Sequence, residues 1–347
     1  MNGKKRETEL DLLRVLATFV VIFTHTPEGD VPLPDGHLVH VLFTAFRLSI
    51  CWAVPAFVMI SGRFFLEKSR NVTVYRLWTG YIPRLLCAFC FWSAVYQLYY
   101  HIIGLTADYT LPQVLAGFVI GNYHMWFIYM IIVMYMLTPL LRPIACDQKL
   151  CAYYLLLFFI VSFLDSYGRD LPKIGWTVKN VLSSAHADML IGYTGYFLLG
   201  SFLRQIQLDR RKERLFYLLG AGGFAFSCFA QAFLPIPEGE DFSYYSEYLR
   251  PNVILAAAAI YYFFCRKVSQ HSFSQASQSL IFHLSGLSFG IYLSHVMILD
   301  LLTYLKYPWI SMTPFLHIPS TALISFVMGA GLTWFIKRIP KLGKILV

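Results

Sequence analysis

The segment LDLLRVLATFVVIFTH, residues 10–25, is apolar over most of its length but contains Arg14 and His25. A cation in hydrocarbon costs about 2.5–3.5 kcal/mol on insertion scales, so such a residue usually faces the interior of a helical bundle. In an α-helix, two residues eleven positions apart lie about 20° apart around the axis and about 16 Å apart along it. We therefore expect one helix face to carry a guanidinium near one membrane surface and an imidazole near the other.

The whole chain has the composition of a membrane protein. Of its 347 residues, 57% are hydrophobic and only 14% are charged, whereas a soluble domain carries roughly 25% charged residues. With about 20 apolar residues per span, we predict an all-α polytopic bundle of about ten transmembrane helices. No connecting loop is long enough to fold separately, so we predict a single transmembrane domain over residues 1–347. The predicted spans are 10–26, 42–65, 80–103, 124–142, 151–165, 187–204, 214–234, 251–265, 284–305 and 316–336.

Lys and Arg are concentrated in the loops on one side of the predicted membrane, mainly at residues 4–6, 210–214 and 337–338. Because cytoplasmic loops are enriched in these residues, we place both termini in the cytoplasm. The net charge of +9 then reflects this orientation, and we expect no nucleic-acid partner. The cysteines fall in spans or cytoplasmic loops, so we expect no disulfide.

Asp11 lies three residues before Arg14 on the same helix face, where the two side chains can pair. One interpretation is a structural ion pair at the membrane surface, with His25 as a capping or interfacial residue. The other is that Arg14 holds an anionic cytoplasmic ligand while His25 acts as a base, because imidazole changes its charge near neutral pH. The residues alone leave both interpretations open.

The second and third predicted helices add further candidates. Ser61, followed by Gly62, forms a small hydrogen-bonding spot that suits either tight helix packing or a ligand, and packing is the commoner use. Arg76 precedes the third predicted helix. Arg84 opens that helix and is expected to line a polar cavity, because an arginine at that depth needs a polar surrounding.

Histidines and aromatic residues mark two later helices. The fourth predicted helix begins HMWFIY (124–129), and the ninth contains SFGIYLSH (288–295). His124 suits a solvated residue, and Trp126 suits an interfacial aromatic belt. Both also suit a substrate pocket. Tyr292 and His295 lie deeper, and the common alternative for His295 is a structural histidine with a satisfied hydrogen bond. No histidine spacing matches a zinc motif, so we expect no metal.

Taken together, several segments resemble the acyltransferase-3 family of bacterial integral membrane acyltransferases. The first is an Arg followed after ten residues by a His, as in Arg14 and His25. The chain departs from the family pattern at Arg63, where an aromatic residue is usual, and at Thr79, where a second basic residue often follows Arg76. The other segments that carry the resemblance are DLLR (11–14), FVMISG (57–62), IPRL with FWS (82–85, 91–93), HMWF with LTPLLRP (124–127, 137–143), GYFLLG (195–200) and SFGIYLSH (288–295).

The resemblance implies an O-acetyltransferase of the stand-alone type that modifies surface glycans. Acetyl-coenzyme A, or a related acyl-coenzyme A, would bind from the cytoplasm as a co-substrate, with its phosphates near basic residues. His25 would deprotonate the acceptor hydroxyl or form an acyl-imidazole. The acceptor would be a glycan or a lipid-linked hydroxyl at the bacterial cytoplasmic membrane. The residues expected at the donor phosphates are Arg14, Arg76 and Arg84, those expected to stabilise the oxyanion are Ser61, His124 and Trp126, and Asp11, Tyr292 and His295 are expected in the same pocket.

A second class of function is kept open. Intramembrane His and Arg also suit proton-coupled transport, and some relatives in this family are associated with serine uptake. The chain could therefore be an amino-acid transporter or a membrane sensor of the same fold. The absence of an evident inverted repeat in the sequence mildly disfavours transport. The sequence leaves open the acceptor, the acyl chain length and association into homo-oligomers.

Overall fold

A computed structural model describes residues 6–28, 38–70, 72–187, 192–237, 239–240, 243–306, 312–340 and 343–346. In these residues all regular structure is helical and no strand occurs. Eight helical segments of this described part are long and apolar enough to cross a membrane. The predicted class, an all-α polytopic membrane protein, is therefore confirmed. The eight segments are Leu38–Phe65, Val74–Ile102, Tyr123–Cys146, Gln148–Gly168, Arg210–Phe233, Tyr244–Gln270, Gln275–Tyr304 and Pro314–Lys337.

The count of ten spans and the cytoplasmic placement of the termini stay predictions. Two helices account for the difference from eight. Helix α1 (Thr8–His25) carries Glu9, Asp11 and Arg14 within its 18 residues. Helix α10 (Tyr193–Gln205) is only 13 residues long.

Several predicted boundaries differ from the structure. The predicted span 42–65 corresponds to the segment Leu38–Phe65, which is interrupted between α2 (Leu38–Ser49) and α3 (Ala53–Phe65). Pro55 explains the break, because its ring lacks a backbone N–H and collides with the carbonyl four residues earlier. The segments predicted as loops at 104–123 and 166–186 contain α6 (Leu111–Ile120) and α9 (Gly175–Ser184).

The chain forms two compact units, and each is described by itself. Unit 1 consists of residues 1–24, 33–71 and 140–282, and unit 2 of residues 25–32, 72–139 and 283–347. The divisions fall near one end of α1 and inside α7 (Trp126–Cys146) and α13 (Gln275–Tyr304). The prediction of a single domain over residues 1–347 stays a prediction.

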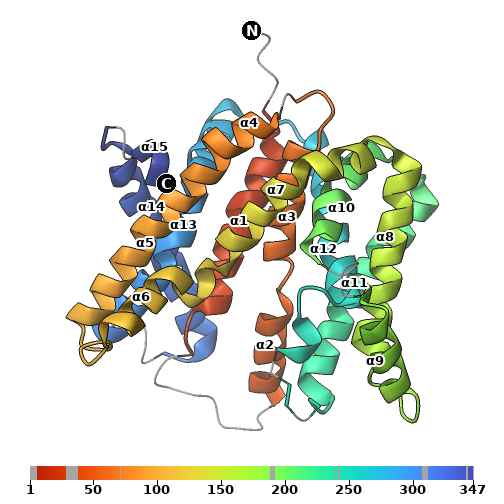
Figure 1. The fold of residues 1–347 in the computed structure, drawn as a ribbon, viewed down its shortest axis with the longest axis horizontal. Helices are drawn as coiled ribbons and strands as arrows, with labels where there is room; N and C mark the ends of the chain where they lie inside the picture. Colours follow the sequence, from red (N-terminus) through yellow and green to blue (C-terminus); the bar gives the residue numbers. More distant parts are fainter. Residues whose placement is uncertain are drawn as a thin grey trace. The chain divides into compact units, whose positions relative to one another are not determined.

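Unit 1 is built on a close contact between α3 and α10 (Figure 1). A Cβ atom at Gly62 would collide with the backbone carbonyl of Phe197, and one at Gly200 with that of Met59. The two backbones therefore touch, as small residues allow in membrane helices. Tight packing, the commoner interpretation of the Ser61–Gly62 pair, is confirmed. Helices α8 (Gln148–Phe163) and α12 (Pro251–Arg266) pack against α10, and α11 (Arg210–Phe233) packs against α12 and α2.

Two helices of unit 1 begin with an aspartate cap. The Asp147 carboxylate accepts hydrogen bonds from backbone N–H groups at the start of α8. Asp209 does the same for Arg211 and Lys212 at the start of α11. The hydrogen bond from the Lys212 backbone lowers the pKa of Asp209. These caps satisfy helix N–H groups that have no partner within the helix.

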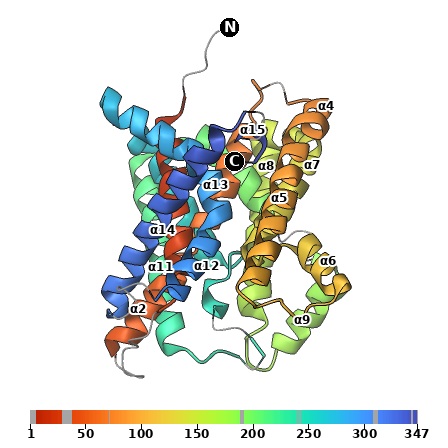
Figure 2. The same ribbon diagram turned by 90° about the vertical axis from the view of Figure 1, so that its left-hand side faces the viewer.

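In unit 2, α5 (Ile82–Ile102) runs beside α13, as Figure 2 shows, and two long-range hydrogen bonds hold it in place. The Tyr96 hydroxyl donates to the Leu293 carbonyl of α13 at 2.9 Å. The Trp92 indole N–H donates to the Leu346 carbonyl of α15 (Gly343–Leu346) at 3.3 Å. Gly329 of α14 (Pro314–Lys337) packs against α13.

The remaining short elements of the two units are α4 (Val74–Arg76), η1 (Leu77–Tyr81), η2 (Tyr123–Met125), η3 (Leu164–Gly168), η5 (Tyr244–Ser246) and η6 (Val268–Gln270).

Candidate active site

His25 is the last residue of α1 and contacts a second imidazole from α13. Its Nδ1 atom lies 3.1 Å from Nε2 of His295. The two rings are stacked, with centroids 5.2 Å apart. His295 is completely buried, and its Nδ1 lies 2.5 Å from the Tyr292 carbonyl oxygen. The predicted base and a predicted pocket residue, 270 positions apart, therefore form a hydrogen-bonded pair in unit 2.

His124, in η2, adds a third imidazole to this cluster. Its ring meets that of His295 edge to face, with centroids 4.9 Å apart. The Tyr292 hydroxyl donates to the backbone carbonyl of His124, which ties η2 to α13. His25 also packs against the ring of Tyr123. We call His25, His124 and His295 the histidine cluster.

A chain of hydrogen bonds runs from His124 to a carboxylate. Tyr100 donates its hydroxyl hydrogen to Asp300 at 3.1 Å and accepts one from the Asn122 amide nitrogen at 2.7 Å. The Asn122 carbonyl oxygen then faces Nδ1 of His124 at 3.1 Å. That oxygen only accepts, so Nδ1 of a neutral His124 carries the hydrogen and Nε2 carries the lone pair. In this form Nε2 of His124 accepts a hydrogen bond, whereas the expected stabilisation of an oxyanion would require it to donate one.

The Nε2 atom of His124 could bind a ligand, because it is buried and has no hydrogen-bond partner among the described residues. A buried polar atom without a partner costs about 1–3 kcal/mol. The cost is avoided when a bound hydroxyl or water supplies the missing hydrogen bond. Trp126, the first residue of α7, is 37% exposed and lies two residues after His124.

Unit 1 contains a different kind of cluster at the first turn of α1. The Asp11 carboxylate binds Arg14 at 2.8 Å and Arg6 at 2.6 Å, so the predicted Asp11–Arg14 pair is present. The Asp11 side chain is 7% exposed, whereas that of Arg14 is 30% exposed. The guanidinium of Arg14 is therefore held by its own helix and still reaches the surface of this unit.

More ion pairs surround this turn. Arg63 binds Glu7 at 2.8 Å, and Arg204 lies 3.4 Å from Glu9 and 3.6 Å from Glu7. Arg63, a departure from the family pattern, also lies 3.4 Å from Glu67. Three helices thus contribute opposite charges to one network, which keeps the charges paired where water is scarce.

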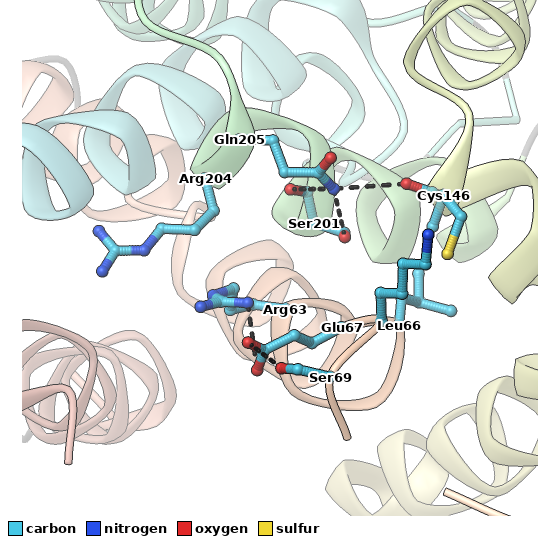
Figure 3. Close-up of a pocket in the computed structure, with 10 residues that line it drawn as sticks. Arg63, Leu66, Glu67, Ser69, Cys146, Ser201, Arg204 and Gln205 are labelled. Carbon is cyan, nitrogen blue, oxygen red and sulfur yellow. Dashed lines mark hydrogen bonds and ion pairs between the residues drawn. The ribbon is translucent and has the colours of Figure 1, made fainter. Parts of the chain in front are cut away.

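Two cavities adjoin these ion pairs within unit 1. The larger, of about 770 Å³, is lined by Arg6, Arg204, Arg266, Gln270 and Phe282, among others. The smaller, of about 380 Å³, is lined by polar groups that include Ser201 and Gln205 (Figure 3). Arg204 lines both cavities. Volumes of about 300–1,000 Å³ are typical of small-molecule sites.

Two predicted donor-binding residues lie elsewhere. Arg76 ends α4 and Arg84 lies near the start of α5, both exposed and both in unit 2. Neither of the two cavities includes them. The expectation that Arg84 lines a polar cavity therefore finds no support in these cavities. Ser61 lies on α3 beside the Gly62 contact and lines neither cavity.

Sequence reasoning missed several residues of both clusters. Asn122 stands two positions before His124, and that closeness was a usable signal. Tyr100 and Arg204 had no such signal, because each meets its partners only through packing. Among the described residues, no group of three or more His, Cys, Asp or Glu side chains is arranged to hold a metal ion.

Comparison with known proteins gives the class. A family model for the acyltransferase-3 family, described as an acyltransferase domain, matches residues 7–337. Because the match covers nearly the whole chain, the protein belongs to the acyltransferase-3 family and is a multi-pass membrane acyltransferase. No curated protein and no solved structure matches the chain.

Proposed function

We propose that the protein transfers an acetyl group from cytoplasmic acetyl-coenzyme A to a hydroxyl of an extracytoplasmic or lipid-linked glycan, in a bacterial cytoplasmic membrane. The observation that carries this proposal is the position of His25. The family signature places a histidine at the end of α1, and in this fold it lies among buried imidazoles that can accept and return a proton.

The chemistry requires one base. His25 takes the proton of the acceptor hydroxyl as its oxygen attacks the thioester carbonyl carbon. The carbon–sulfur bond then breaks, and the coenzyme A thiolate takes the proton from His25. A neutral imidazole suits both transfers because it gains and loses a proton near neutral pH. In the family-level variant His25 is first acylated, so one of its ring nitrogens acts as a nucleophile.

The donor's charged end is proposed to bind in unit 1. Coenzyme A carries phosphates, and arginine is well suited to bind them in a planar, bidentate way. The cavity of about 770 Å³ offers Arg6, Arg204 and Arg266, together with the Phe282 ring. The Arg6 guanidinium stacks on that ring at 4.3 Å and shares Asp11 with Arg14. These contacts support Arg14 as part of the donor site and add Arg6 and Arg204 in place of Arg76 and Arg84.

One helix connects the two proposed roles. Arg14 and His25 both belong to α1, so about 16 Å of helix separates them along the axis. The pantetheine arm of coenzyme A is long and uncharged, and it can therefore enter an apolar bundle where a phosphate cannot.

The test is acyl transfer by the purified protein in lipid nanodiscs. Acetyl-coenzyme A labelled in its acetyl group and a glycan acceptor are supplied, and free thiol and labelled ester are both measured. We expect His25→Gln and His25→Ala to lower the rate about 100- to 10,000-fold, the usual contribution of a general base. His101→Gln is the matched control, since His101 is an exposed histidine of α5 in the same unit.

Two results would contradict the proposal. One is full activity in both His25 variants. The other is uptake of a labelled amino acid such as serine into vesicles while no thiol is released, which would favour the transporter class.

A further inference from the structure

The hydrogen bonds of His295 determine which of its nitrogens carries a hydrogen. Its Nδ1 lies 2.5 Å from the carbonyl oxygen of Tyr292. A carbonyl oxygen only accepts, so Nδ1 of His295 is the N–H group. A neutral imidazole has one N–H, and Nε2 of His295 must therefore be the bare nitrogen. It can take part in the 3.1 Å contact with His25 only as an acceptor.

The same reasoning then applies to His25. Its Nδ1 faces the bare nitrogen of His295 and must supply the hydrogen of that bond. The lone pair of a neutral His25 is consequently on Nε2. We propose that His295 is a positioning residue that holds His25 in the Nδ1–H form and makes Nε2 the reacting atom. The inference rests on the proposed function of His25 and assigns the atom that performs it.

A charged His295 would reverse this assignment. With hydrogens on both nitrogens, it would donate to Nδ1 of His25 and leave the hydrogen on the nitrogen that should react. Its surroundings oppose that charge, because His295 is completely buried and its ring packs against His25, His124 and Tyr292. Among the described residues, His295 makes no ion pair with a carboxylate. A buried charge without a counter-ion is costly, so the neutral form of His295 is the one held here.

His295 also assists once the proton has moved. When Nε2 of His25 gains a proton, its Nδ1–H becomes the donor of a charge-assisted bond to Nε2 of His295, and such bonds are stronger than neutral ones. The Tyr292 carbonyl stabilises the other end of His295. Partners that fix the orientation and the protonated nitrogen of a metal-ligating histidine are worth about 10- to 100-fold, and we expect an effect of the same order for His25.

The kinetic test compares three variants with the wild type. His295→Phe keeps a flat ring but removes both hydrogen bonds, and we expect kcat to fall about 10- to 100-fold with little change in the KM for the acyl donor. His295→Gln can accept from His25 through its side-chain oxygen and donate to Tyr292 through its nitrogen, so it should recover most of that loss. His317→Phe is the control, since His317 is also a buried histidine of unit 2 but lies on α14, outside the histidine cluster.

A spectroscopic test needs no acyl transfer. Nuclear magnetic resonance of protein labelled at the histidine nitrogens distinguishes a bare ring nitrogen from an N–H, and His25→Gln identifies the signals of His25. We expect Nδ1 of His25 to be the N–H in the wild type and this preference to weaken in His295→Phe.

The outcomes separate the inference from the function on which it rests. A wild-type His25 with its hydrogen on Nε2, an unchanged kcat in His295→Phe, or a folded His295→Gln as slow as His295→Phe would each overturn the role of His295. If the wild type transfers no acyl group at all, the proposed function fails, while the resonance measurement still decides whether His295 sets the form of His25.

Discussion

The charged cluster of unit 1 and the histidine cluster of unit 2 use two different ways to keep polar groups in an apolar protein. Around Asp11, Arg63 and Arg204, the groups are ionised and each charge meets an opposite one. Around His25 and His295, hydrogen bonds between neutral groups carry the contact, and their direction is fixed by a backbone carbonyl. An arginine in an ion pair keeps further N–H groups that can bind an anion, whereas a neutral imidazole can take up a proton. The difference suits the two tasks proposed for the two clusters, donor binding and proton transfer.

The largest expected effect in this comparison comes from removing the carboxylate that two arginines share. Asp11→Ala removes the carboxylate that binds both Arg6 and Arg14. The arginines that remain are 50% and 30% exposed, so water screens their charges, and we expect a loss of about 1.5–3 kcal/mol, the usual contribution of hydrogen bonds to charged groups. The free energy of unfolding in mixed micelles measures this. Lys212→Ala is the control, because it breaks an ion pair of the same three-residue spacing whose lysine is 73% exposed, and its loss should be far smaller. Equal losses would show that the ion pairs of unit 1 are only surface contacts.

A second prediction compares helix packing in the two units. Gly62→Ala in unit 1 places a methyl group against the backbone carbonyl of Phe197, which cannot move aside. We expect a loss of about 1–3 kcal/mol in unfolding free energy, as for other overpacked sites. In unit 2, a Cβ at Gly329 meets Ile291 and Ser294 side-chain atoms at 3.3 Å, and small shifts can relieve that contact.

Gly329→Ala should therefore cost less than Gly62→Ala in the same measurement. Gly222→Ala is a useful reference, since a Cβ there meets nothing within 4 Å and alanine favours a helix by about 0.5–1 kcal/mol. A Gly62→Ala protein as stable as the wild type would contradict the close α3–α10 contact.

The smallest loss of stability is expected in the series of hydrogen bonds that orients His124. Tyr100→Phe removes the hydroxyl that links Asn122 to Asp300. A typical hydrogen bond contributes about 0.5–1.5 kcal/mol, so we expect a loss near 1 kcal/mol in unfolding free energy. Tyr109→Phe is the control at an exposed tyrosine of unit 2. A loss as large as that of Asp11→Ala would mean that the hydrogen-bond chain of unit 2 is as strongly coupled as the ion pairs of unit 1.

Much of the candidate site follows from residues that are close in the sequence. Arg14 and His25 lie on one helix as their spacing predicted, and Asp11 pairs with Arg14 as expected for positions three apart. The choice of Arg76 and Arg84 for the donor rested on the family resemblance and on their position near the predicted cytoplasmic side. The position of an arginine along the chain indicates its depth in the membrane, but it does not show which side chains line a cavity.

By itself, the sequence determined that this is a helical membrane protein of the acyltransferase-3 family and that a cation and an imidazole share its first helix. Those properties depend on composition and on short motifs, each made of residues that are close together in the sequence. Only the tertiary structure decided that His295, 270 positions from His25, supplies its hydrogen-bond partner and that Arg204 binds the acids before and within α1. Such contacts depend on how separate helices pack and on the direction of each hydrogen bond, and no pattern within a single helix specifies either.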